Sequence, residues 1–189
     1  RDHLRDNAFL RLTGRLRERA HYLDIVDLRQ GVEVGSEADE TLREEHVLMV
    51  CLDEIKRARP YMVVLLGDRY GWVPPAQRSR YAASTAGLTA GIDVAGRSVT
   101  ELEILYGILE NRDEPVRGYV YLRTLDQTGL PAEVADRFPE ETPDEDPASP
   151  AGRLRALKAR LRREMPDRVR DYTLRWDADR GGLTGLEEL

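Results

Sequence analysis

The feature that most constrains the fold is an unbroken apolar run, Tyr61-Met62-Val63-Val64-Leu65-Leu66, which ends at Gly67. The run is far too short to cross a bilayer, which takes about 20 residues in a helix. A run of this kind without alternating polar residues is typical of a parallel strand that helices cover on both faces. It therefore predicts a central strand of a parallel α/β sheet.

The patterns around this run predict helices and strands in alternation. Expected helices span about Asp2 to Ala20, Leu42 to Ala58, a segment that starts at Ser98 or Thr100, and Leu154 to about Pro166. Further strands are expected at Tyr22–Leu28, Val116–Leu122 and Val169–Trp176. Residues 31–40 and the acidic, proline-rich stretch 139–150 are predicted loops, and residues 74–97 are a long excursion for which a partly helical structure is the alternative. This alternation predicts right-handed crossovers in one sheet, and hence a single domain over 1–189.

Composition excludes several classes of function. The chain has 189 residues and a net charge of −6, so a nucleic-acid-binding face is not expected. It contains one cysteine, Cys51, and three scattered histidines, which predicts neither a disulfide framework nor a metal site. Cys51 lies on the apolar side of a predicted helix and is expected in the core. These features predict a cytoplasmic protein without a membrane anchor.

Candidate binding residues follow from one rule of open α/β sheets. Ligands bind outside the carboxyl ends of the strands, and the glycines of Gly67-Asp68-Arg69-Tyr70-Gly71-Trp72 would let a ligand approach the backbone closely. An arginine there offers a fork for phosphate or carboxylate. The alternative is that these residues only close a strand. The predicted substrate-binding residues are Asp27, Arg29, Gly67, Asp68, Arg69, Tyr70 and Ser98.

Two carboxylates, Glu101 and Glu103, lie in the first turns of the helix expected at Ser98. Two positions on a helix are separated by about 200°, so only one of them can face the cleft. A carboxylate there could bind a ribose hydroxyl or stabilise an oxocarbenium-like centre while an N-glycosidic bond breaks. The alternative is that both are surface acids that favour the positive end of the helix dipole. No phosphate-binding P-loop or dinucleotide fingerprint is present.

Four segments carry a family resemblance. Asp27-Leu28-Arg29, Cys51-Leu52-Asp53-Glu54-Ile55, residues 66–74 and Ser98-Val99-Thr100-Glu101-Leu102-Glu103 resemble domain of unknown function 4062, a TIR-like domain at the front of NACHT and other STAND NTPases. The resemblance implies a flavodoxin-like parallel sheet flanked by helices. It also implies a first strand and a turn ahead of Arg1, which are missing from this sequence.

The resemblance implies a signalling role more strongly than catalysis. The first hypothesis is an N-terminal effector or signalling domain of a STAND-type protein in bacterial antiviral defence, which hydrolyses NAD when it forms homo-oligomers. The catalytic carboxylate is then Glu103, or Glu101 if the alignment shifts by one register, and Arg29 and Arg69 hold phosphates. NAD is the substrate in this hypothesis, and no cofactor is expected. The alternatives are a non-enzymatic self-association adaptor and a nucleoside deoxyribosyltransferase-like enzyme.

Overall fold

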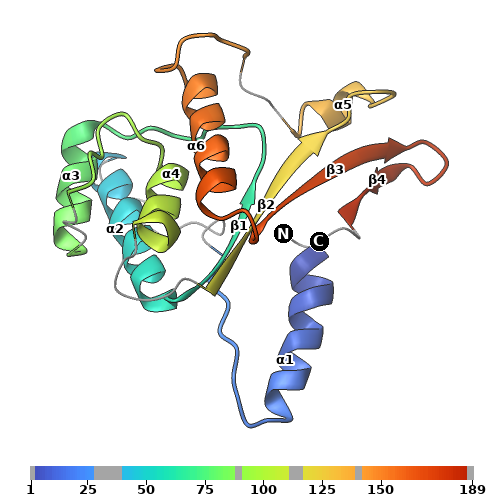
Figure 1. Ribbon diagram of the computed structural model, residues 1–189, viewed down its shortest axis with the longest axis horizontal. Helices are drawn as coiled ribbons and strands as arrows, with labels where there is room; N and C mark the ends of the chain where they lie inside the picture. Colours follow the sequence, from blue (N-terminus) through green and yellow to red (C-terminus); the bar gives the residue numbers. More distant parts are fainter. Residues whose placement is uncertain (1–2, 28–39, 88–90, 111–116, 139–141, 187–189) are drawn as a thin grey trace.

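The computed structural model of this protein describes residues 3–27, 40–87, 91–110, 117–138 and 142–186. Its central element is a four-stranded sheet. Three strands run parallel, and a short fourth strand is antiparallel to the third, in the order β1-β2-β3-β4 (Figure 1). Val64 pairs with Val120, and Val120 pairs with Val169. The predicted parallel sheet is thus confirmed, whereas β4 in the glycine-rich tail was not predicted. The strands are β1 (Tyr61–Leu66), β2 (Arg117–Leu125), β3 (Val169–Asp177) and β4 (Gly182–Thr184).

The helices agree with the predicted alternation. Two π-helical turns extend α-helices. The turn η1 (Leu4–Phe9) leads into α1 (Leu10–Arg17), and η3 (Leu105–Leu109) continues from the end of α4 (Val99–Ile104). The other helices are α2 (Glu40–Ala58), α3 (Ala76–Thr85), α5 (Ala132–Ala135) and α6 (Pro150–Glu164). The excursion at 74–97 is therefore partly helical. At α6, the hydroxyl of Ser149 accepts a hydrogen bond from the Gly152 N–H at 3.0 Å, and Pro150 occupies the first turn, where no N–H is needed.

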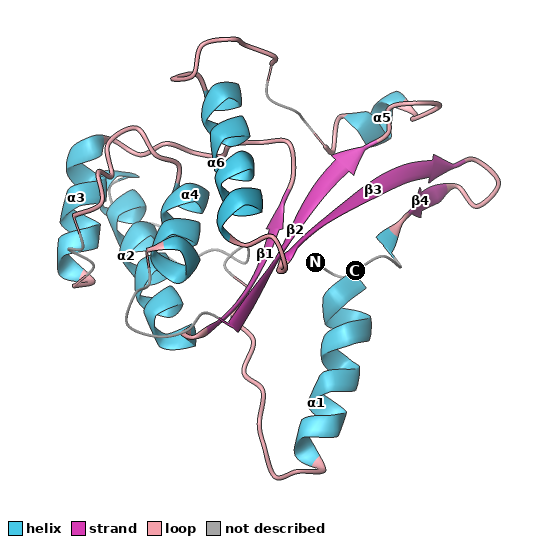
Figure 2. Cartoon of the chain, in the orientation of Figure 1, coloured by secondary structure: helices cyan, strands magenta, loops and turns pink. Residues whose placement is uncertain are grey.

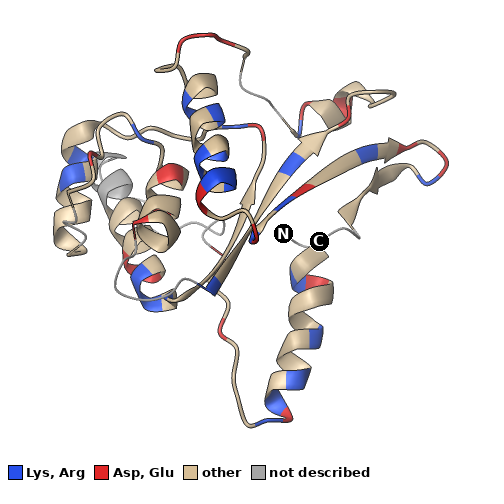
Figure 3. Cartoon of the chain, in the orientation of Figure 1, with Lys and Arg blue, Asp and Glu red and all other residues tan. Residues whose placement is uncertain are grey.

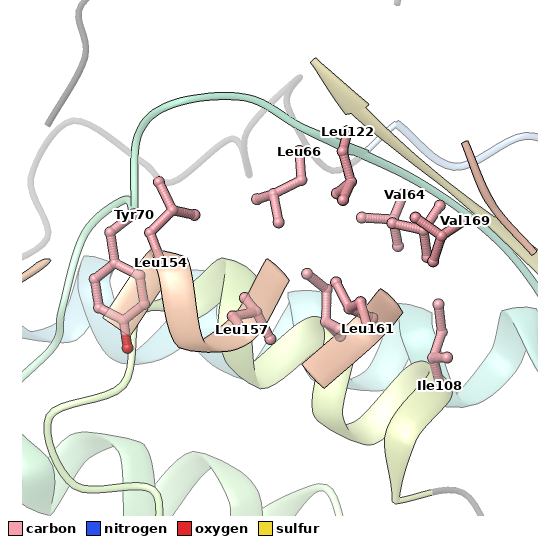
Figure 4. Close-up of a cluster of buried hydrophobic side chains, with 11 residues drawn as sticks. Val64, Leu66, Tyr70, Ile108, Leu122, Leu154, Leu157, Leu161 and Val169 are labelled. Atoms are coloured by element: carbon pink, nitrogen blue, oxygen red, sulfur yellow. The ribbon is translucent and has the colours of Figure 1, made fainter. Parts of the chain in front are cut away.

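One face of the sheet carries the main core. Both crossover segments, α4–η3 and α6, pack on this face, as expected when successive parallel crossovers have the same hand. Figure 4 shows Leu154, Leu157 and Leu161 of α6 opposite the strand side chains. The arrangement of a mostly parallel sheet with flanking helices is the flavodoxin-like one that the sequence predicts. The core residues are Val64, Leu66, Tyr70, Ile104, Ile108, Val120, Leu122, Leu154, Leu157, Leu161 and Val169.

A second apolar cluster joins α2 and α3 to α4–η3. It is formed by Leu48, Leu52, Ala82, Ala83, Val94, Leu102 and Tyr106. Gly107 lets η3 approach the sheet closely, because a Cβ atom there would lie 2.4 Å from the Met62 sulfur and 3.2 Å from a methyl carbon of Ile55. The two clusters fix α4 between the sheet and α2, and this positions the side chains at the start of α4.

The opposite face of the sheet is covered at one end only. Leu125, Tyr172 and Leu174 are buried there, with Leu130, Phe138, Leu183 and Leu186 packed against them. Towards β1, the side chains of Tyr61, Val63 and Tyr119 are 61%, 47% and 48% exposed. On its other edge β1 has no partner strand among the described residues. We call this edge, with Tyr61, Val63 and Tyr119, the open sheet surface.

The strand predicted at Tyr22–Leu28 is wrong for the residues that the structure describes. Residues 21–27 have no regular secondary structure and run as a loop in Figure 2, and Leu28 lies outside the described residues. Tyr22, Ile25 and Val26 are exposed. The composition favours a strand, but a strand forms only when its backbone groups pair with a neighbour, and no described strand pairs with this segment.

Candidate functional site

The two sequence blocks that were predicted to form a site meet beyond the carboxyl end of β1. The Val99 N–H donates a hydrogen bond to the Trp72 carbonyl oxygen at 3.0 Å. Gly71 has φ +94°, and a Cβ atom there would lie 3.4 Å from the Thr100 hydroxyl. A side chain at position 71 would therefore be strained and crowded, so the glycine lets the loop pack on the helix start. We call this contact the loop–helix junction.

Ser98 begins α4 as its N-cap, as predicted. Its hydroxyl accepts a hydrogen bond from the Glu101 N–H at 3.2 Å, and the residue is fully buried. Of the two predicted caps, Ser98 and Thr100, the structure uses the first. The cap fixes the residue at which the first turn of α4 begins.

Glu101 is the glutamate that faces the loop–helix junction. It is only 7% exposed. Its carboxylate accepts hydrogen bonds from the Tyr70 hydroxyl and from the Arg97 guanidinium. Burial raises the pKa of Tyr70 to about 12, with the Glu101 carboxylate as the next cause, while hydrogen bonds from the Ser98 backbone and the Arg153 side chain act in the opposite direction. Glu101 thus joins the loop to α4 through hydrogen bonds, and each of its two carboxylate oxygens already accepts one.

Glu103 faces away from the junction, as the rotation of about 200° requires. It is half-buried and lies beside Cys51 of α2. Burial, with the nearby Glu103 carboxylate as the next cause, raises the pKa of the Cys51 thiol to about 12. The cysteine is in the core, as the sequence predicts.

The Cys51 thiol should not react with Ellman's reagent at pH 8 in the folded protein. Its pKa is raised, so the reactive thiolate is scarce until the pH approaches 12, and burial blocks access. Absorbance should report one thiol per chain only after denaturation in urea. Rapid labelling of the native protein would contradict the assignment.

A second polar cluster lies at the same end of the sheet and was only partly predicted. The Lys158 amino group donates to Asp68 Oδ1 at 2.9 Å, and the Arg123 guanidinium lies 3.5 Å from Asp68 Oδ2. A Cβ atom at Gly67 would lie 2.6 Å from the Arg123 guanidinium, so the glycine leaves room for it. Arg123 directly follows the predicted strand 116–122, and the strand-end rule applied to that strand would have found it. Lys158 had no such signal.

The other predicted residues are not brought into these contacts. Arg69 is exposed, and Asp27 lies in the segment that forms no strand. Arg29 is outside the described residues. The structure therefore gathers Gly67, Asp68, Tyr70, Ser98 and Glu101 at one end of the sheet, where Arg69 lies in the same loop with an exposed side chain.

An open pocket of about 320 Å³ lies at the opposite end of the sheet. Its lining comes from the end of η3 and the turn between α6 and β3, namely Ile108, Leu109, Glu164, Met165, Pro166, Asp167 and Arg168. We give it less weight than the polar clusters, since ligands in open α/β sheets bind at the carboxyl ends of strands.

Neither a metal site nor a membrane-spanning helix is found in the part of the chain that the structure describes. No group of three or more His, Cys, Asp or Glu side chains is placed to hold a metal ion. Among the same residues, no helix is long and apolar enough to cross a membrane. The described polar groups can bind anions or donate hydrogen bonds, and the buried Glu101 is not presented to solvent as a free carboxylate.

Comparison with known proteins identifies a family but no characterised relative. No curated protein and no solved structure matches the chain. The family model described as "Domain of unknown function (DUF4062)" matches residues 13–173. This span includes the loop–helix junction and the Asp68, Arg123 and Lys158 cluster. The chain therefore belongs to the DUF4062 family of domains of unknown function.

Proposed function

We propose that the chain is a TIR-like signalling domain of a larger STAND-type protein and that it acts by self-association through the open sheet surface. The observation that carries the proposal is the exposure of Tyr61, Val63 and Tyr119 beside the free edge of β1. Larger exposed apolar patches on soluble proteins mark interaction sites. Membership of the DUF4062 family is compatible with the proposal.

The composition of β1 supports this proposal. Natural edge strands are protected by charged residues, prolines or bulges, because their free N–H and C=O groups can pair with another chain. From Tyr61 to Leu66 the strand has no charge and no proline, which is the composition of an interior strand. At the edge it is suited to pairing with further protein.

The exposed apolar residues of the N-terminal arm also support association between copies. Leu10 and Leu12 of α1 and Tyr22, Ile25 and Val26 of the following loop are exposed. Figure 1 shows α1 extending away from the sheet, and Tyr61, Val63 and Tyr119 remain exposed within one copy. An amphipathic helix and an apolar sheet face are each stabilised by burial, and two copies can bury the arm of one against the sheet of the other.

Replacing Tyr119 with aspartate should weaken this association. The charge would be buried without a partner in the assembly, which weakens binding by at least about tenfold. Tyr81→Asp on α3 is the matched control, since Tyr81 is also an exposed tyrosine but lies away from the open sheet surface. Mass should be measured by light scattering on the full-length protein. A protein that stays monomeric when activated, or assembly that survives Tyr119→Asp, would contradict the proposal.

Cleavage of NAD is a second candidate, and the loop–helix junction is the observation that favours it. The junction brings a carboxylate, an arginine and a tyrosine together where α/β sheets bind ligands. Cleavage would break the bond between the ribose C1′ and the nicotinamide nitrogen, and water would supply the hydroxyl of ADP-ribose. At this junction the Glu101 carboxylate would stabilise the ribosyl cation once the substrate displaced one of its two donors, whereas Glu103 would act only if the substrate bound on the other side of α4.

Incubation of the full-length protein with NAD under oligomerising conditions tests this candidate. If the protein is an NAD hydrolase, nicotinamide should appear, and Glu103→Gln or Glu101→Gln should reduce its release at least about a hundredfold. Comparison of the two variants shows which of the two glutamates supplies the catalytic carboxylate. Absence of nicotinamide release under every assembling condition excludes the enzymatic form and leaves self-association intact.

A further inference from the structure

We propose that Arg123 and Lys158 form a binding site for a phosphate monoester or inorganic phosphate, and that the incoming anion displaces Asp68 from these two cations. The site is separate from the loop–helix junction. It depends neither on self-association nor on NAD cleavage.

The site is built from several elements that converge on one end of the sheet. Asp68 follows β1, Arg123 lies near the end of β2, and Lys158 belongs to α6. Tyr172 of β3 lies close to them: burial raises the pKa of its hydroxyl, and the charges of Arg123 and Asp68 act on that pKa in opposite directions. Figure 3 shows basic residues along α6 and on β2. Ligands of parallel sheets bind at this end of the strands.

The charges of this cluster are not balanced. Among the residues that the structure describes, these two cations share one carboxylate, and the side chains of Lys158, Arg123 and Asp68 are 16%, 18% and 23% exposed. Withdrawing a cation from water is unfavourable unless an anion and hydrogen bonds replace the water. A second anionic group would therefore stabilise the pair Arg123 and Lys158.

Arg123 also has unused hydrogen-bonding capacity. Its Nε–H is buried and has no hydrogen-bond partner among the described residues. Its contact with Asp68 is long, at 3.5 Å. The guanidinium is held in place by the Phe138 ring, whose centroid lies 4.9 Å from the guanidinium carbon. A planar fork fixed by stacking, with donors to spare, is suited to a phosphate.

Phosphate matches this site better than a carboxylate does. A phosphate monoester carries a charge between about −1.5 and −2 at pH 7, close to the charge of the two cations together. Arginine binds phosphate with paired donors, and lysine adds a point charge. Gly67 keeps the approach to Arg123 free of a side chain, because a Cβ atom at that position would collide with the guanidinium.

Titration calorimetry with inorganic phosphate, with AMP as a phosphate monoester and with acetate tests the proposal on the full chain. Saturable binding of phosphate or AMP, and no binding of acetate at the same concentration, is expected. Tighter binding of AMP than of phosphate would identify a monoester as the ligand, and equal binding would identify the phosphate group alone. Arg123→Gln and Lys158→Gln should each weaken binding at least about tenfold.

Asp68→Asn separates this site from a purely structural ion pair. Removing the competing carboxylate should tighten phosphate binding about tenfold, whereas a structural pair predicts no gain in affinity. Arg162→Gln is the control on the same helix, because Arg162 pairs with Asp171 at the surface and should change affinity less than twofold. Absence of saturable phosphate binding, or Asp68→Asn binding no tighter than the unaltered chain, overturns the proposal.

Discussion

Replacing Glu101 with alanine should lower the free energy of unfolding by about 2–4 kcal/mol. The buried carboxylate accepts hydrogen bonds from Tyr70 and Arg97, so its removal takes one acceptor from each of these largely buried groups, although Arg97 still donates to the Asp93 carbonyl oxygen. Because the side chain of Arg97 is 28% exposed, water recovers part of the loss. Urea denaturation followed by circular dichroism measures the change.

Glu103→Ala is the matched control for this substitution. Glu103 belongs to the same helix turn but is half-buried, and the Cys51 thiol that donates to it is a weaker donor than a hydroxyl or a guanidinium, so its loss should cost less than the loss of Glu101. Glu101→Gln should fall between the two, because an amide oxygen can still accept from Tyr70. Equal costs for the two alanine variants would show that Glu101 does not anchor the loop.

Aspartate at two neighbouring positions of β1 should have very different effects. Val64 is 5% exposed in the core, and Val64→Asp should cost more than about 4 kcal/mol or prevent cooperative unfolding, since it buries an unpaired carboxyl. Val63 points to the open sheet surface, so in dilute protein Val63→Asp should cost about 1 kcal/mol from strand propensity alone. Urea denaturation at low protein concentration measures both changes.

The difference of about 3 kcal/mol or more between these variants tests whether one face of β1 is bare. The substitutions are chemically identical and lie in the same strand, so propensity cancels. If both variants lost the same stability, the face that carries Val63 would be covered in the monomer, and the open sheet surface would not exist.

Most of the fold could be predicted from the sequence because its signals are local. The apolar run of β1, the helical period that ends before Pro60 and the cap at Ser98 each determine an element without distant residues. Tyr22–Leu28 has the composition of a strand, but pairing depends on a neighbour that the segment itself does not encode. The short β4 carries no pattern of its own and forms by pairing with β3.

The candidate site could be predicted only in part, because only some of its residues are marked by local sequence signals. The strand-end rule identified the loop after β1 and the start of α4, and the structure joins them. It could not decide between Glu101 and Glu103, because the choice depends on where α4 packs between the sheet and α2. Lys158 reaches Asp68 only through the packing of α6, a contact between residues 90 positions apart.

Amide hydrogen exchange along β1 tests the account most directly, since it reports on the edge through which the protein is proposed to associate. About half of the N–H groups from Tyr61 to Leu66 point away from β2, because a parallel strand directs its groups to both sides. Exchange should be compared in the full-length protein below and above its association concentration. The account predicts that these amides slow at least about tenfold on association while those of α3 do not change. Association that leaves β1 exchange unaltered would contradict it.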